Sequence, residues 1–174
     1  MAFPSRGYFM LYAARFACLI ALFLMGRLAS AQLAIPMPGS PEQAVQYANS
    51  AVDDPLAPDA TDKRQAAFKY LENDHNVGVL LCSDVVHELN DGPKTKASRE
   101  VFFQYAASAG TAIYANPSLA KDMAGQNLAG ITAALHVYQQ FVSQDKTVHI
   151  KFMDKAEAAQ QQDKLPEFIA KHCK

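Results

Sequence analysis

Residues 102–142 read FFQYAASAGTAIYANPSLAKDMAGQNLAGITAALHVYQQFV, and this stretch decides the fold. Two runs rich in Ala, Gly and Ser, 106–110 and 124–134, stand on either side of the break Asn116-Pro117-Ser118. Larger apolar residues recur at helical spacing in both halves. Because small side chains let two helix backbones approach closely, the stretch predicts a tight antiparallel pair of helices.

Three more helices are predicted before this pair, and the first two are marked by their end signals. The first begins at Ser40-Pro41, with Ser as the cap and Pro at the first helical position, and it is stopped by residues 53–58. The second begins after Asp59 or Thr61 and ends at the turn 73–76. Phe68 and Leu71 mark its inward face. We place its basic residues mostly on the other faces: Lys63, Arg64 and Lys69.

The segment from Val77 to Leu89 has apolar residues on two adjacent helical rows. A helix that is apolar over so much of its circumference is typical of a buried position, so the pattern predicts a central helix with Cys82 in its apolar stripe. Residues 90–93, which include Gly92 and Pro93, end it.

Near the C-terminus, residues 148–152 alternate between apolar and polar, which suits a strand, but they also fit a helix that continues to Ala159. We favour the helix because no partner strand is evident. Leu165-Pro166 starts a short last helix that carries Cys173 on its apolar face. The sequence therefore predicts a single all-α domain over 41–174, an irregular bundle of five to seven helices.

Residues 1–31 have the pattern of a secretory signal peptide. Arg6 and Arg15 precede or border a ten-residue apolar run at 16–25, and cleavage is expected between Ala31 and Gln32. A spanning helix needs roughly 20 apolar residues, so we prefer this interpretation to a short membrane anchor or a buried helix. Residues 32–40 then form an extended leader, and the mature protein is periplasmic or secreted, with no stable membrane span after cleavage.

The charge of the chain excludes classes of partner that need a strongly basic surface. The 174 residues include 16 basic and 17 acidic side chains. Cleavage after residue 31 would remove three arginines and leave 13 basic against 17 acidic residues, a net charge of −4. We therefore expect no nucleic-acid binding.

Cys82 and Cys173 are the two cysteines that remain after cleavage. Thiols outside the cytoplasm tend to be oxidised, and an even number favours pairing, so we predict a disulfide between them. The alternative is two buried free thiols. No Cys-x-x-Cys spacing indicates a redox site.

One group of side chains could carry chemistry. Asp84, His87 and Glu88 are spaced i, i+3 and i+4, which places two carboxylates and an imidazole on one helical face. Such a group could orient a general base or supply metal ligands, although the polar face of an otherwise apolar helix is the interpretation we favour. No cofactor or metal is predicted.

From these observations we favour an exported small helical protein that binds an unknown protein partner and has no catalytic activity. Two alternatives stay open. One is a small secreted hydrolase that uses Asp84, His87 and Glu88. The other is a carrier that holds a small apolar ligand between the small-residue helices, beside Ala109, Gly130 and Ile113.

Overall fold

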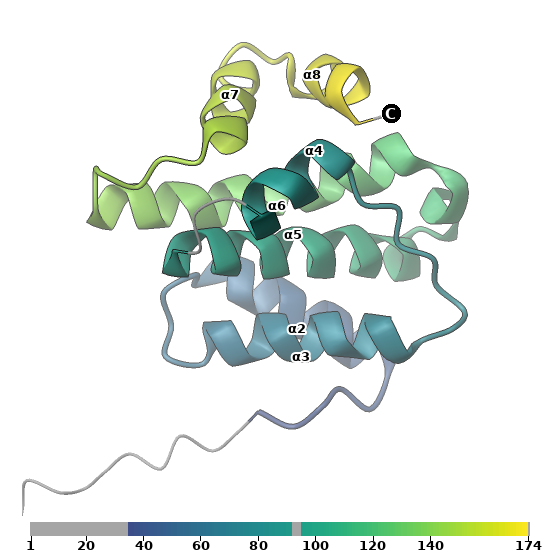
Figure 1. The fold of residues 1–174 in the computed structure, drawn as a ribbon. Coiled ribbons are helices and arrows are strands. Elements are labelled where there is room, and N and C mark those ends of the chain that lie inside the picture. The colour runs from purple at the N-terminus through teal and green to yellow at the C-terminus, as the bar shows by residue number, and fades with distance from the viewer. Residues whose placement is uncertain (1–34, 92–94, 174) are drawn as a thin grey trace, which may run out of the picture. The chain divides into compact units, whose positions relative to one another are not determined.

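The domain is built around one long helix, α5. The computed structural model describes residues 35–91 and 95–173, and over these residues it contains seven α-helices, two short helical turns of other types and no strand (Figure 1). The elements are α2 (Pro41–Asp53), α3 (Ala60–Asn73), α4 (Ser83–Val86), η2 (His87–Asp91), α5 (Lys96–Ala115), η3 (Pro117–Lys121), α6 (Met123–Gln144), α7 (Lys151–Gln160) and α8 (Leu165–His172). The prediction of an all-α bundle is confirmed. The predicted signal peptide and its cleavage site at Ala31 and Gln32 lie outside the described residues.

α5 and α6 form the predicted hairpin, and side-chain caps fix where each helix starts. Thr95 and Ser98 make a capping box at the start of α5, in which the Thr95 hydroxyl accepts from the Ser98 N–H at 3.0 Å and the Ser98 hydroxyl accepts from the Thr95 N–H at 2.9 Å. Asp122 caps α6 by accepting from the Gly125 N–H at 3.0 Å. These caps satisfy amide groups that a helix start otherwise leaves unpaired.

Gly130 lies at a close approach between the two helices of the hairpin. A Cβ placed on Gly130 would lie 2.7 Å from the carbonyl oxygen of Tyr105 and 2.9 Å from the Cβ of Ala109. Such distances leave no room for any side chain at this point. The small residues therefore serve helix packing, as the sequence predicted.

Gly130→Val should lower the free energy of unfolding by about 1–3 kcal/mol, because the added side chain must displace the backbone of α5. Gly78→Ala is the matched control, since a Cβ at Gly78 would have no other atom within 4 Å. Urea unfolding of both variants measures the difference. Equal stability of the two variants would contradict the close approach.

α5 separates two layers that pack in different ways (Figure 1). On one side α2 and α3 approach it through alanines, and Ala48, Ala67 and Ala107 form a small cluster without exposed surface. On the other side α4, α6, α7 and α8 enclose the larger core. The largest of its fully buried side chains include Val85, Val101, Tyr105, Ile131, Leu135, Tyr138, Met153 and Ile169.

The predicted helix over 77–89 is wrong in its first half. Residues 77–82 have no regular secondary structure, Cys82 has extended backbone angles (φ −68°, ψ 122°), and helix begins only at Ser83. The side chains of this segment, which we call the strap, alternate: Gly78 and Leu80 are exposed, whereas Val79 and Leu81 are partly buried. The apolar residues suit a helix and a half-buried extended segment equally well, and contacts with α5 and α6 decide between them.

The segment 148–152 contains no strand, and only its last two residues are helical. Residues 148–150 are extended, and α7 begins at Lys151. The Tyr138 hydroxyl on α6 accepts a hydrogen bond from the Ile150 N–H at 3.4 Å and also contacts Asp154. Burial and the nearby Asp154 carboxylate raise the pKa of Tyr138 to about 12, so its hydroxyl stays protonated. The helix that we favoured for 148–152 therefore starts three residues later than expected.

Candidate functional site

The structure brings the three predicted polar residues to one hollow. Asp84 lies on α4, and His87 and Glu88 lie on η2; all three border a cavity of about 430 Å³. The opposite wall is formed by α7 and α8. These helices add two lysines, a histidine and two aromatic rings: Lys151, Lys155, His172, Phe152 and Phe168.

The carboxylates in this hollow have different surroundings. Glu88 Oε1 accepts a hydrogen bond from the Phe152 N–H at 2.8 Å, in the first turn of α7, where Ile150 provides no side-chain cap. Glu88 therefore has a structural role as a cap for a distant helix. Asp84 is more than half exposed, and its Oδ2 lies 3.6 Å from Nδ1 of His172.

The Cys82–Cys173 disulfide positions this pair, and its prediction is confirmed. The two Cα atoms are 4.8 Å apart, and both residues are buried in the larger core. Cys82 precedes Asp84 by two residues, and Cys173 directly follows His172. The covalent bond therefore places His172 beside Asp84. The sequence pattern assigns no site to His172, although the predicted disulfide already implied that it lies near Asp84.

A carboxylate beside a histidine can orient that imidazole as a general base, and nearby lysines can stabilise negative charge. In the hollow these groups are Asp84, His172, Lys151 and Lys155. Within residues 35–91 and 95–173 no group of three or more His, Cys, Asp or Glu side chains is arranged to hold a metal ion. The hollow thus brings together side chains of the kinds that acid–base catalysis uses.

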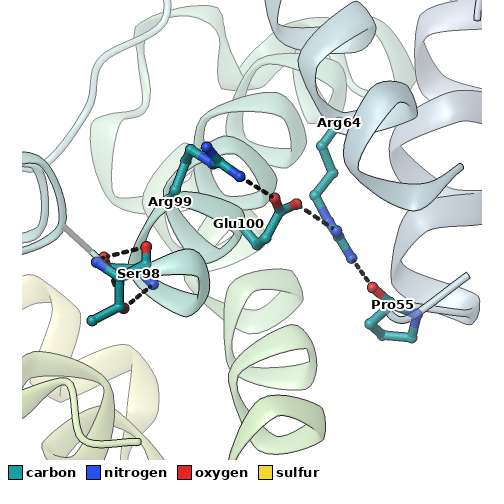
Figure 2. A network of polar contacts seen from close by, with 6 residues as sticks. Pro55, Arg64, Ser98, Arg99 and Glu100 are labelled. Atoms are coloured by element: carbon teal, nitrogen blue, oxygen red, sulfur yellow. Dashed lines mark hydrogen bonds and ion pairs between the residues drawn. The ribbon is translucent and has the colours of Figure 1, made fainter. Parts of the chain in front are cut away.

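A second polar cluster is buried between α2, α3 and α5, and Figure 2 shows its centre. Arg64 of α3 donates to Glu100 Oε2 at 2.9 Å and to Gln104 Oε1 at 3.0 Å, both on α5. Its Nη2 donates to the carbonyl oxygens of Ala51 and Pro55 at 2.9 and 2.8 Å. Arg64 therefore joins three helices and satisfies carbonyls at the end of α2.

The placement of Arg64 on an outer face was wrong, because its side chain is 1% exposed. Burial lowers the pKa of Arg64, and the Glu100 carboxylate opposes that shift. The sequence did contain a signal: Arg64 stands four residues before Phe68 and seven before Leu71, on the same helical stripe. Glu100 and Gln104 likewise stand one turn apart on the inward face of α5.

Two side-chain amides of α6 hold one edge of the strap. The Leu80 N–H donates to Gln126 Oε1 at 2.7 Å, and Asn127 Nδ2 donates to the Leu80 carbonyl at 2.8 Å. The Cys82 N–H donates to Asn127 Oδ1 at 3.0 Å and to the Tyr105 hydroxyl at 2.7 Å. Gln126 and Asn127 thus take the place of a neighbouring strand.

Asn127→Ala should speed hydrogen exchange of the Cys82 amide by about tenfold or more, and should cost about 1–3 kcal/mol of stability, because the Cys82 N–H and the Leu80 carbonyl each lose a hydrogen bond to the Asn127 side chain. Asn73→Ala is the control, since Asn73 makes only an exposed bond to the Lys69 carbonyl. Amide exchange followed by NMR measures both effects. Unchanged exchange at Cys82 in Asn127→Ala would contradict this account of the strap.

The other edge of the strap is unpaired. No hydrogen bond with a described residue reaches the backbone amide or carbonyl of Val79 or Leu81. In an extended chain these groups point in opposite directions at successive residues, so those of Val79 and Leu81 face away from α6. A cavity of about 320 Å³ lies along the strap, and its wall and floor come from α3 and α5: Phe68, Leu71, Glu72 and Ala106.

A third hollow lies between α2, α5 and α6 and has a volume of about 690 Å³. Its lining is mainly small or apolar and includes Val45, Val52, Ala112, Leu128 and Ala129. This groove is distinct from the position considered for an apolar ligand. There, beside Ala109 and Gly130, the helices are in direct contact, so that position is closed to a ligand.

Comparison of the chain with protein-family models, curated proteins and solved structures found no match of any of the three kinds. Among the helices of the described residues, none combines the length and the apolar character that crossing a bilayer would require. The interpretation of function therefore depends on the geometry of this chain alone.

Proposed function

We propose that the protein is an exported, non-catalytic binding protein whose partner is another polypeptide outside the cytoplasm. The observation that carries this proposal is the unpaired edge of the strap, because it offers amide and carbonyl groups beside an apolar cavity. The opposite edge of the strap is bonded to α6, and the Cys82–Cys173 disulfide ties the last helix to the end of the strap. Sites of this kind use main-chain hydrogen bonds for affinity and pockets for specificity.

Export is supported by two independent features. The sequence of residues 1–31 has the pattern of a signal peptide. The disulfide, buried in the core, is of the kind that persists in an oxidising compartment. Together they favour the periplasm or the extracellular space as the place where binding occurs.

The test is affinity capture with the oxidised, processed protein from an extract of the native extracytoplasmic compartment. We expect a mature chain that begins at Gln32, by mass spectrometry, and one partner recovered in stoichiometric amount. An unrelated exported helical protein of similar charge is the control. Intact, unprocessed chain in the cytosol, or no stoichiometric partner in repeated captures, would overturn the proposal.

A small exported hydrolase is the second candidate, and the hollow at Asp84 favours it. Asp84, His87 and Glu88 share this hollow with His172, Lys151 and Lys155, so an imidazole beside a carboxylate lies near cationic groups. Chromogenic ester, phosphodiester and glycoside substrates provide the assay. Activity that is lost in both Asp84→Asn and His172→Gln, at unchanged melting temperature, would support a hydrolase. Activity in neither the native protein nor the variants, or equal activity in all, would count against it.

A further inference from the structure

We propose that the strap binds an extended peptide segment, which pairs with the free edge of Val79 and Leu81 as an added β-strand and inserts an apolar side chain into the cavity beside Phe68. This inference rests on the proposed binding function and specifies its partner. Val79 and Leu81 each offer one backbone N–H donor and one C=O acceptor on the same edge of the strap, and the two residues are two positions apart. The complement of such a series is the backbone of another extended chain.

The cavity beside this edge selects an apolar side chain. Its lining includes Phe68 and Leu71 of α3, Ala106 of α5, and Val79 and Leu81 of the strap itself. Its volume of about 320 Å³ is at the small end of the range for ligand pockets, about 300–1,000 Å³. The site therefore suits one or two side chains of a bound segment.

The flanking helix favours a slender partner over a second copy of the domain. α3 forms the far wall of the cavity, so a pairing strand must fit between α3 and the strap. On the solvent side there is room, because a Cβ at Gly78 would meet no atom within 4 Å. Leu80, which is 37% exposed, adds an apolar contact on that side.

The rim of the cavity is acidic, which indicates the charge of the partner. Glu72 and Asp74 border it, together with His75. The Tyr114 hydroxyl donates to Asp74 Oδ2 at 2.6 Å, and this bond holds the pKa of Asp74 below its usual value, so the carboxylate stays ionised. A basic residue next to the apolar positions of the peptide would complement this rim.

The test uses a synthetic peptide, acetyl-KVTVTVK-amide, added to the oxidised mature protein and followed by NMR hydrogen exchange. In the free protein we expect fast exchange at the Val79 and Leu81 amides and slower exchange at Leu80 and Cys82, whose amides are bonded to α5 and α6. Saturating peptide should slow exchange at Val79 and Leu81 by about tenfold or more. The same peptide with N-methylated central residues should give no protection, because it cannot form the backbone bonds.

Two variants test the charge of the rim. Glu72→Lys should weaken binding of the lysine-flanked peptide several-fold and improve binding of acetyl-EVTVTVE-amide. Glu167→Lys is the matched control, because Glu167 is exposed on α8 and should leave both affinities unchanged. If Glu72→Lys and Glu167→Lys change the peptide affinities equally, the acidic rim does not select the charge of the partner.

Three results would overturn the inference: no binding of the peptide at millimolar concentration, equal binding of the N-methylated peptide, or protection confined to amides outside the strap. Protection of Val79 and Leu81 that rises with protein concentration, without peptide, would show pairing with a second copy and would also overturn it. If affinity capture recovers a partner but the peptide does not bind, the proposed binding function is kept and the peptide site at the strap is rejected. If the peptide binds but no partner is captured, the peptide site at the strap is kept and the proposed function is rejected.

Discussion

Glu100→Ala is expected to lower the free energy of unfolding by about 3–5 kcal/mol, because removal of one member of a buried ion pair leaves the other charge uncompensated. The remaining charge is the guanidinium of Arg64, whose side chain is 1% exposed. Its other contacts are to neutral oxygen atoms of Gln104, Ala51 and Pro55, which orient it but do not neutralise it. Urea unfolding monitored by circular dichroism measures the loss.

The control and a double variant separate this effect from the loss of packing. Glu167→Ala removes an exposed carboxylate and should change stability by less than about 0.5 kcal/mol. Arg64→Met combined with Glu100→Leu removes both charges, and it should cost clearly less than the sum of the two single replacements. A cost below about 1 kcal/mol for Glu100→Ala, or strict additivity in the double variant, would contradict a coupled pair.

Loss of the disulfide should have an effect of similar size. Replacing Cys82 and Cys173 together with Ser should lower stability by about 2–5 kcal/mol, because the bond closes a loop of 91 residues and limits the unfolded chain. The effect has a local part as well. α8 would lose its covalent link to the strap, and His172 would lose the bond that places it near Asp84.

Unfolding of the native protein with and without reductant measures the contribution of the bond, and the double variant should be insensitive to reductant. Titration of free thiols in the denatured mature protein checks the pairing independently. Two titratable thiols without reductant, or equal stability of the native protein and the double variant, would contradict the disulfide.

Local signals predicted most of the fold. Break residues identified the hairpin turn at Asn116, because such a break depends on neighbours within a few positions. The strap was mistaken for helix because its apolar residues fit both periods. Its extended form depends on Gln126 and Asn127, which lie more than 40 positions away in the sequence. Such distant hydrogen bonds leave no local pattern.

The candidate sites were predictable only in part. The spacing of Asp84, His87 and Glu88 indicated a shared face, and the structure shows that they border one hollow. The spacing could not show that Glu88 caps α7, because that bond joins positions 64 apart. The free edge of the strap could not be found at all without its conformation. Charged residues on an inward stripe, as at Arg64, were the signal that sequence reasoning should have used.

The guanidinium of Arg64 also links the folding of segments that would otherwise be separable. Its contacts reach back 13 positions to α2 and forward 40 positions to α5, so all three helices are needed before its charge is compensated. Partial opening that detaches α2 alone would break the hydrogen bonds between the Arg64 guanidinium and the carbonyls at the end of α2. We therefore expect α2, α3 and α5 to exchange their most protected amides as one cooperative unit, with no sub-global state in which the N-terminal helices are released while the remainder stays native.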